Sequence, residues 1–145
     1  MTVLLVEDNH IFAEYITYAL DGVHLEVAGT LAAAKAALSS QPINLVLLDL
    51  GLPDSKGLDT LKGLAEFAVP KVVVTTSHAG AREAAKLGAC DYCLKSRPEE
   101  MLERIKFNID KARRVRRPRF DEAVFNQIKA CFVPVGMGSK LTLAT

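Results

Sequence analysis

The sequence predicts an α/β fold: a doubly wound, five-stranded parallel sheet with helices on both faces. Short apolar runs alternate along the chain with segments whose apolar residues recur at helical spacing. The runs that end at Val6 and Leu48 are apolar at consecutive positions, which is typical of strands buried on both faces, as in a parallel sheet. Parallel strands that alternate with helices are joined by right-handed crossovers.

The predicted elements alternate from the N-terminus onwards. They are a strand at 2–6, a helix at 11–20, a strand at 24–28, a helix at 30–39, a strand at 43–48, a helix at 57–67, a strand at 71–75, a helix at 79–87, a strand at 91–94 and a helix from residue 98. Asp8 or Asn9 can cap the first helix, and Thr30 can cap the second. The first helix has one apolar stripe, formed by Phe12, Tyr15, Ile16, Ala19 and Leu20.

Glycine and proline mark the element ends in the second half of this series. Gly57 begins the third helix, and Pro70 introduces the fourth strand. Gly88 is a natural C-cap for the short helix before it. Pro98 stands at the first position of the last helix, where proline is favoured.

Length and composition indicate a soluble protein with one main domain. The chain has 145 residues, of which half are hydrophobic and 24% are charged. No apolar run approaches the roughly 18 residues that suggest a membrane span. The chain shows no signal peptide at its start, and its three cysteines are an odd number. We therefore expect reduced thiols and a cytoplasmic location.

The C-terminal tail differs from the rest of the chain in charge. Residues 1–110 carry 10 basic and 15 acidic side chains, whereas residues 111–145 carry 8 and 2. Six of the nine residues from Lys111 to Arg119 are basic, which suggests either a nucleic-acid arm or the solvated end of a helix followed by a linker. We favour a linker that starts at Pro118.

Residues 118–145 are expected to form this linker and an amphipathic helical extension to a domain of residues 1–117. An apolar stripe is predicted on a helix at 121–132, formed by Val124, Phe125, Ile128 and Phe132. The segment is too short for a DNA-binding or catalytic domain of its own, so we expect no nucleic-acid partner. Three outcomes are open for this helix. It docks on its own subunit, it docks on a second copy of the chain and so gives a homodimer, or it leads into a longer protein.

Carboxylates follow two of the apolar runs directly. Asp49 ends the third predicted strand, and the pair Glu7 and Asp8 ends the first. A carboxylate at a strand end is often only a turn former or a helix cap. In open parallel sheets, however, the ligand site lies beyond the carboxyl ends of the strands. Three carboxylates at that edge need a cation.

Several motifs occur in an order that resembles the receiver domains of bacterial response regulators in two-component signalling. They are Val6-Glu7-Asp8-Asn9, Leu48-Asp49-Leu50-Gly51-Leu52-Pro53-Asp54 with Gly57, Thr75-Thr76-Ser77, Gly88-Ala89, Tyr92 and Lys95. The resemblance covers about residues 2–113. It implies a flavodoxin-like strand order of 2-1-3-4-5, which would bring these residues to one edge of the sheet.

The resemblance implies a phosphoacceptor and a metal site. Asp49 would accept a phosphoryl group from a phosphohistidine on a sensor kinase or phosphotransfer protein. Mg²⁺ would be bound by Asp8, Asp49 and the backbone carbonyl of Gly51, with Glu7 acting through water. Apart from self-phosphorylation and slow self-dephosphorylation, the resemblance implies no enzyme activity.

The resemblance also implies two phosphate contacts and a switch residue. Lys95 would pair with one phosphate oxygen, and the hydroxyl of Thr76, or of Thr75, would bond another. Tyr92 would be the switch aromatic, although simple packing in a strand is the alternative. The output would be a change in protein–protein interactions.

Two features depart from the family pattern. The stretch from Thr76 to Gly88 is about three residues short, and the family's Lys-Pro is Lys95-Ser96 here. A cis bond before Ser costs about 2.5–4 kcal/mol, so this bond is either trans or strained. The short stretch leaves room for a second hypothesis, a receiver-like interaction module that does not depend on phosphorylation. A transcription factor that uses the arginine cluster ranks last.

Overall fold

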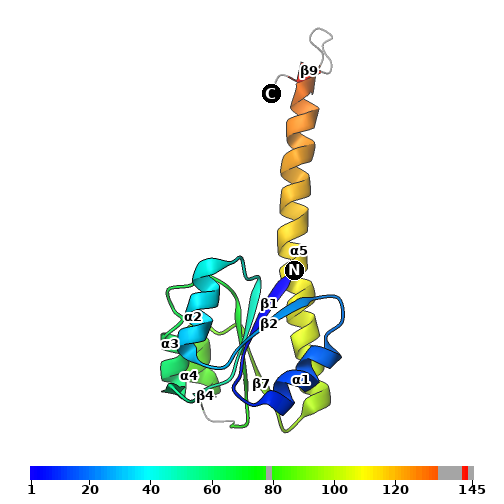
Figure 1. The fold of residues 1–145 in the computed structure, drawn as a ribbon. Helices are drawn as coiled ribbons and strands as arrows, with labels where there is room; N and C mark the ends of the chain where they lie inside the picture. The colour runs from blue at the N-terminus through cyan, green and yellow to red at the C-terminus, as the bar shows by residue number, and fades with distance from the viewer. Residues whose placement is uncertain (78–79, 134–141, 144–145) are drawn as a thin grey trace. The chain divides into compact units, whose positions relative to one another are not determined.

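The computed structural model describes the backbone of residues 1–77, 80–133 and 142–143, and the side chains of residues 1–77 and 80–114. The chain divides into two compact units, Met1–Asp110 and Lys111–Thr145. The first unit holds the sheet and the helices that cover it (Figure 1). No helix of the described part is both long and apolar enough to span a membrane.

The first unit is built on a five-stranded sheet in which all neighbours are parallel. The strand order is β2-β1-β3-β6-β7. These strands are β1 (Thr2–Val6), β2 (His24–Ala28), β3 (Leu45–Leu48), β6 (Lys71–Thr75) and β7 (Asp91–Leu94). The order confirms the expected 2-1-3-4-5 arrangement of the five main strands, and the α/β class is confirmed with it.

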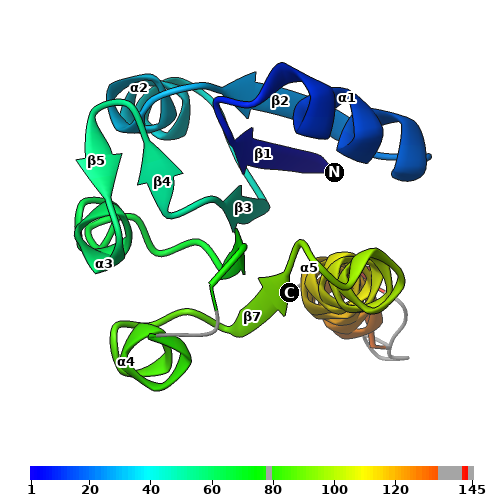
Figure 2. The ribbon, with the colours of Figure 1, turned by 90° about the horizontal axis from the view of Figure 1, so that it is seen from below.

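Helices cover both faces of this sheet. They are α1 (His10–Ala19), α2 (Leu31–Ser40), α3 (Leu58–Lys62), α4 (Ala81–Lys86) and α5 (Pro98–Cys131). Within the first unit, α1 and the start of α5 lie on one face, and α2, α3 and α4 lie on the other (Figure 2). Each face has its own apolar core, and the strand residues alternate between them: Leu5 and Leu47 point to the first, Leu4 and Leu48 to the second. Strands buried on both faces explain the continuous apolar runs.

At the start of α1 and of α2, a cap residue's side-chain oxygen accepts one of the N–H groups that have no partner within the helix. Asn9 Oδ1 accepts the N–H of Phe12 at 3.0 Å, and Thr30 Oγ1 accepts that of Ala33 at 3.0 Å. Both caps agree with the sequence.

A further cap on α2 comes from the loop after β3. The carboxylate of Asp54 accepts the N–H groups of Leu31 and Ala32 at 2.8 and 3.1 Å. The bond from Leu31 holds the pKa of Asp54 below its usual value. The loop that follows Asp49 is therefore tied to α2 by a residue 23 positions away in the chain.

The loop after β3 and the helix after it both differ from the prediction. Residues 51–56 form a small antiparallel hairpin of β4 (Gly51–Leu52) and β5 (Ser55–Lys56), which the sequence did not predict. The helix predicted at 57–67 is confined to α3, because Gly63 has a low helix propensity and stands as its C-cap. Beyond it, the N–H groups of Leu64 and Phe67 bond carbonyls three residues back, as in 3₁₀ turns.

The last helix also differs from the prediction. It runs through Pro118 to Cys131, whereas the sequence predicts a linker that begins at Pro118. Proline removes one helical hydrogen bond, but the arginines before it and the residues after it favour helix, so the secondary structure is continuous. A boundary between a domain of residues 1–117 and an extension of residues 118–145 stays a prediction.

The second unit also contains a short antiparallel pair, β8 (Phe132–Val133) with β9 (Thr142–Leu143). The predicted apolar stripe lies outside the residues whose side chains are described.

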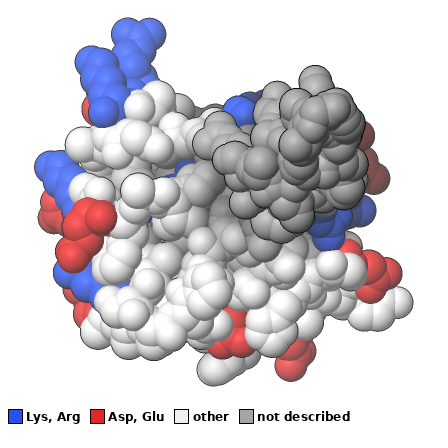
Figure 3. Space-filling model, turned by 90° about the horizontal axis from the view of Figure 1, so that it is seen from above, with Lys and Arg blue, Asp and Glu red and all other residues white. Residues whose placement is uncertain are grey.

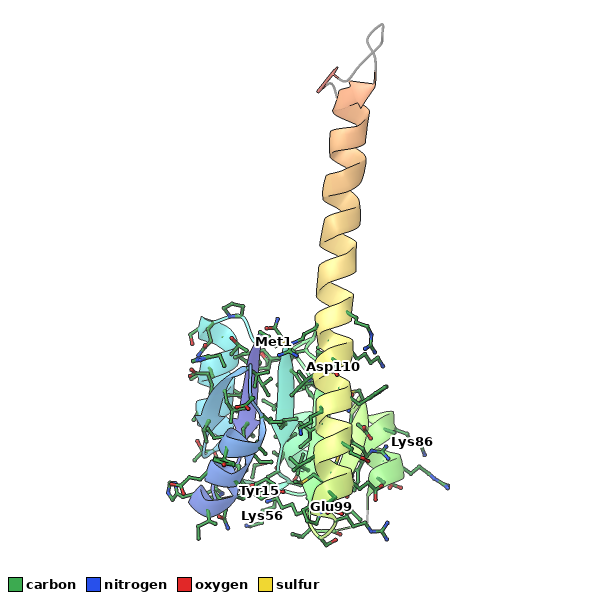
Figure 4. All side chains as sticks on the ribbon, turned by 90° about the vertical axis from the view of Figure 1, so that its right-hand side faces the viewer. Met1, Tyr15, Lys56, Lys86, Glu99 and Asp110 are labelled. Atoms are coloured by element: carbon green, nitrogen blue, oxygen red, sulfur yellow. The ribbon has the colours of Figure 1, made fainter. Side chains whose placement is uncertain are left out.

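The two ends of the sheet are distinct. Met1 and Asp110 lie near the end where the strands begin, whereas Lys56 and Glu99 lie near the end where they finish (Figure 4). On the part of the face in Figure 3 that is not drawn in grey, Lys and Arg as well as Asp and Glu lie mainly at the edges.

Candidate functional site

A cavity of about 540 Å³ opens at the carboxyl edge of the sheet. It is lined by the ends of β1, β3 and β6, by β7, and by the loops that follow them. The lining residues are Glu7, Asp8, Asn9, Asp49, Leu50, Gly51, Gly57, Leu58, Thr75, Thr76, Ser77, Tyr92 and Lys95. Every residue that the sequence analysis placed in the site is among them. The topology gathers them because parallel strands end at one edge.

Three carboxylates gather in this cavity. Glu7 and Asp8 follow β1, and Asp49 follows β3, which is the neighbour of β1 in the sheet. One carboxylate oxygen from each lies within 4.8 Å of the others. Glu7 is buried, Asp8 is exposed, and the Asp49 side chain is 13% exposed. Clustered carboxylate oxygens at an open cavity are the ligands that Mg²⁺ prefers, so the residues present fit this ion.

Glu7 is held in place from two sides. Its Oε2 accepts the N–H of Asn9 at 3.1 Å, and its Oε1 accepts a hydrogen bond from Lys95 Nζ at 2.5 Å. Lys95 Nζ also lies 3.7 Å from Asp49 Oδ1, which is an ion-pair distance rather than a hydrogen bond. Lys95 therefore compensates the two most buried carboxylates of the site.

The pKa of Asp49 is raised to about 6. Burial is the largest cause, and the negative charge of Glu7 is the next. Lys95 and a hydrogen bond from the Gly51 N–H lower the pKa of Asp49 but do not cancel these effects. A cation that binds close to Asp49 would therefore stabilise its charged form.

This pKa predicts a pH-dependent effect of Asp49→Asn on stability without metal. The Asp49 pKa is higher in the folded protein than its ordinary 3.8, so its contribution to stability is complete below pH 3.8 and is lost as the pH rises through about 6. The asparagine side chain of the variant carries no charge and escapes this loss. We expect the variant to gain melting temperature relative to the unsubstituted protein between pH 4 and pH 7, as measured by thermal unfolding in a chelator. A difference in melting temperature that stays constant from pH 4 to pH 7 would contradict the raised pKa of Asp49.

Two threonines and Tyr92 complete the rim. Thr75 is the last residue of β6 and is buried, whereas Thr76 is exposed, and both line the cavity. The Tyr92 hydroxyl donates to the carbonyl of Ser77 at 2.8 Å, and burial raises the pKa of Tyr92. Tyr92 also lines a second cavity of about 150 Å³ between α4, β7 and α5. Tyr92 thus lies between the site and a neighbouring surface.

The backbone around Lys95 is regular. The N–H of Lys95 donates to the Thr75 carbonyl at 2.8 Å and continues the pairing of β6 with β7. No peptide bond between described residues is cis, so the Lys95–Ser96 bond is trans. The sequence left open whether this bond is trans or strained, and the structure has a trans bond.

One neighbour of the site was not predicted. The sequence assigns Phe12 only to the apolar stripe of the first helix, but Lys95 Nζ lies 4.4 Å from the centroid of its ring. Phe12 and Lys95 are 83 positions apart, and no motif relates them. An aromatic side chain in the first turn of the helix after an acidic pair is the only signal that the sequence offers.

Comparisons with known proteins agree with this geometry. A family model described as the response regulator receiver domain matches residues 3–106. The photosynthetic apparatus regulatory protein RegA of Rhodovulum sulfidophilum is 37% identical over 100 residues, which are 65% of this chain and 55% of RegA. The chain spans about half the length of the curated relatives it matches.

Solved structures show the same fold. A CheY-like receiver domain protein from Methanospirillum hungatei JF-1 superposes with a TM-score of 0.68 at 27% identity, over 78% of this chain and 96% of that one. The response regulator Rcp1, in a Mn²⁺-bound form, gives a TM-score of 0.62 at 29% identity, over 72% and 88%.

Proposed function

This chain belongs to the family of response regulator receiver domains, and from that premise we propose that it takes a phosphoryl group on Asp49 from a phosphohistidine. The donor would be a sensor kinase or a phosphotransfer protein in the cytoplasm. One observation carries the proposal. Asp49 stands at the end of β3 in an open cavity, beside two further carboxylates and 3.7 Å from a lysine.

The chemistry assigns a separate task to each group. An oxygen of Asp49 forms the new bond to phosphorus as the phosphorus–nitrogen bond of phosphohistidine breaks, and the departing imidazole is protonated. Mg²⁺ held by Asp8, Asp49 and the Gly51 carbonyl, with Glu7 acting through water, would neutralise negative charge on the carboxylates and the phosphoryl group. Lys95, the residue after β7, would supply a second positive charge.

Phosphorylation would redistribute the contacts of Lys95 and the threonines. Lys95 now bonds Glu7, and a phosphoryl group on Asp49 would compete for its ammonium. Thr76, or Thr75, would donate a hydrogen bond from its hydroxyl to another phosphoryl oxygen, and a movement of Tyr92 would change the surface beside α4 and α5.

Separate Thr75→Ala and Thr76→Ala variants identify the threonine that bonds the phosphoryl group, because loss of that threonine should slow phosphorylation.

Transfer from a phosphorylated donor protein tests the proposal. Radiolabelled histidine kinases and phosphotransfer proteins should pass the label to this chain and fail to do so with Asp49→Asn.

The alternative is a receiver-like interaction module that works without phosphorylation, and the short helix α4, Ala81–Lys86, is the observation that favours it. Partner binding that is equal with and without label would support that alternative.

We also propose that the C-terminal helix mediates a homodimer. Support comes from the sequence, where Val124, Phe125, Ile128 and Phe132 make an apolar stripe that seldom stays exposed. A chain that stops before Pro118 should be monomeric by light scattering, and the full chain should have twice the mass of one subunit. A monomer in both cases would overturn the dimer.

A further inference from the structure

The ring of Phe12 lies against Lys95, a residue of the candidate site, although Phe12 does not line the cavity and offers no ligand for a metal ion or a phosphoryl oxygen. Lys95 Nζ lies 4.4 Å from the centroid of this ring, 2.5 Å from Glu7 Oε1 and 3.7 Å from Asp49 Oδ1. The ammonium is therefore enclosed by one ring and two carboxylates, and the lysine side chain is only 17% exposed. We propose that Phe12 is a positioning residue that holds Lys95 beside Asp49, an inference that rests on the proposed function.

The ring is itself fixed on the body of the protein. Its backbone N–H is bonded to the cap residue Asn9, so its place in the first turn of α1 is set. The side chain packs against the apolar core between α1, the sheet and α5. The ring of Tyr15 lies on it at 6.1 Å between centroids with a tilt of 46°, a favourable aromatic geometry. A ring held in this way presents a constant face to the lysine.

An aromatic ring suits this position better than a charged partner would. The negative face of the ring attracts the ammonium without neutralising it, so Lys95 keeps its full charge for the phosphoryl group. A further carboxylate there would add negative charge to a site that already holds Glu7, Asp8 and Asp49, and would repel the donor. The ring also accepts no strong hydrogen bond, which leaves ammonium protons for oxygen acceptors.

The consequence is that Lys95 is ordered before the donor arrives. A lysine side chain has several rotatable bonds, and fixing them during the reaction would add to its barrier. Because the ring and Glu7 fix the ammonium when the protein folds, the entropy lost in ordering Lys95 does not add to the barrier of phosphoryl transfer. Loss of the ring's attraction should slow phosphorylation by roughly threefold to tenfold.

Fluorinated phenylalanines at position 12 test this inference, because fluorine weakens the negative face of the ring and changes its shape little. We expect the rate of labelling by phosphoramidate with Mg²⁺ to fall stepwise from phenylalanine to its mono-, di- and trifluoro forms. In a Lys95→Met background the residual rate should not depend on fluorination. The same series at Phe107, which is 58% exposed on α5, is the matched control and should have no effect.

A second measurement does not depend on phosphorylation. The ε-methylene protons of Lys95 should be shifted upfield by the ring current in the unphosphorylated protein, and this shift should vanish in Phe12→Leu and persist in Phe12→Tyr. Labelling that is indifferent to fluorination, or an unshifted lysine signal, would overturn the role of Phe12 alone. An unsubstituted protein that takes no label would overturn the proposed function and this inference with it.

Discussion

Asp49→Asn is expected to reduce labelling by acetyl phosphate or phosphoramidate by on the order of a thousandfold or more, because it removes the nucleophile. The substitution keeps the size of the side chain and its place at the end of β3, so the fold should survive. We expect neither of the other two carboxylates to replace Asp49. Glu7 is already bonded to Lys95 and Asn9, and Asp8 follows a different strand. Phosphate release or intact mass measures the loss.

Asp54→Asn is the matched control for this variant. Asp54 lies five positions further along the same loop, but its carboxylate is directed to the start of α2 and takes no part in the acidic cluster. Its loss should lower stability at neutral pH, where the carboxylate is charged, and leave labelling close to normal. Full labelling of Asp49→Asn, or equal loss in both variants, would contradict the assignment of Asp49.

Removal of Mg²⁺ is expected to have the second largest effect, a fall in labelling of roughly a hundredfold or more. Three carboxylates with oxygens within 4.8 Å of one another repel, and the pKa of Asp49 is raised first by burial and next by the charge of Glu7. A divalent cation would relieve this repulsion, and we expect it to bind only the folded chain. At a Mg²⁺ concentration ten times its Kd, the folded state should gain about 1.4 kcal/mol. Thermal unfolding with and without Mg²⁺ measures this gain.

Asp8→Asn should remove most of the Mg²⁺ effect on both labelling and melting temperature. Asp59→Asn is its control, since Asp59 is an exposed carboxylate on α3 outside the cluster. If Mg²⁺ leaves the melting temperature unchanged in the unsubstituted protein and in Asp8→Asn alike, the metal site is wrong.

The fold and the common location of the candidate site residues were predictable because both follow from rules that act over short stretches of sequence. Consecutive apolar residues before Asp49 and before Glu7 indicate strands buried on both faces, and such strands end at one edge of a parallel sheet. The structure brings Asp8, Asp49 and Lys95 to that edge as expected. The helix caps Asn9 and Thr30 were predictable for the same reason, because each bonds an N–H group only three residues further along the chain.

The features that the sequence did not predict depend on contacts between distant residues or on weak local preferences. The ring of Phe12 under Lys95 and the bond from Leu31 to Asp54 join segments that no spacing relates. The end of α3 at Gly63 and the passage of α5 through Pro118 are decided by small differences in helix propensity. Periodicity of apolar residues does not resolve such differences.

The intact mass of the unsubstituted protein after incubation with phosphoramidate and Mg²⁺ tests the central claim most directly. The proposed function predicts a gain of one phosphoryl group per chain, which is lost after treatment with base or hydroxylamine, as an acyl phosphate on Asp49 requires. A known receiver domain labelled in parallel confirms that the donor is active. An unchanged mass under conditions that label this control would show that the chain is not a phosphoacceptor.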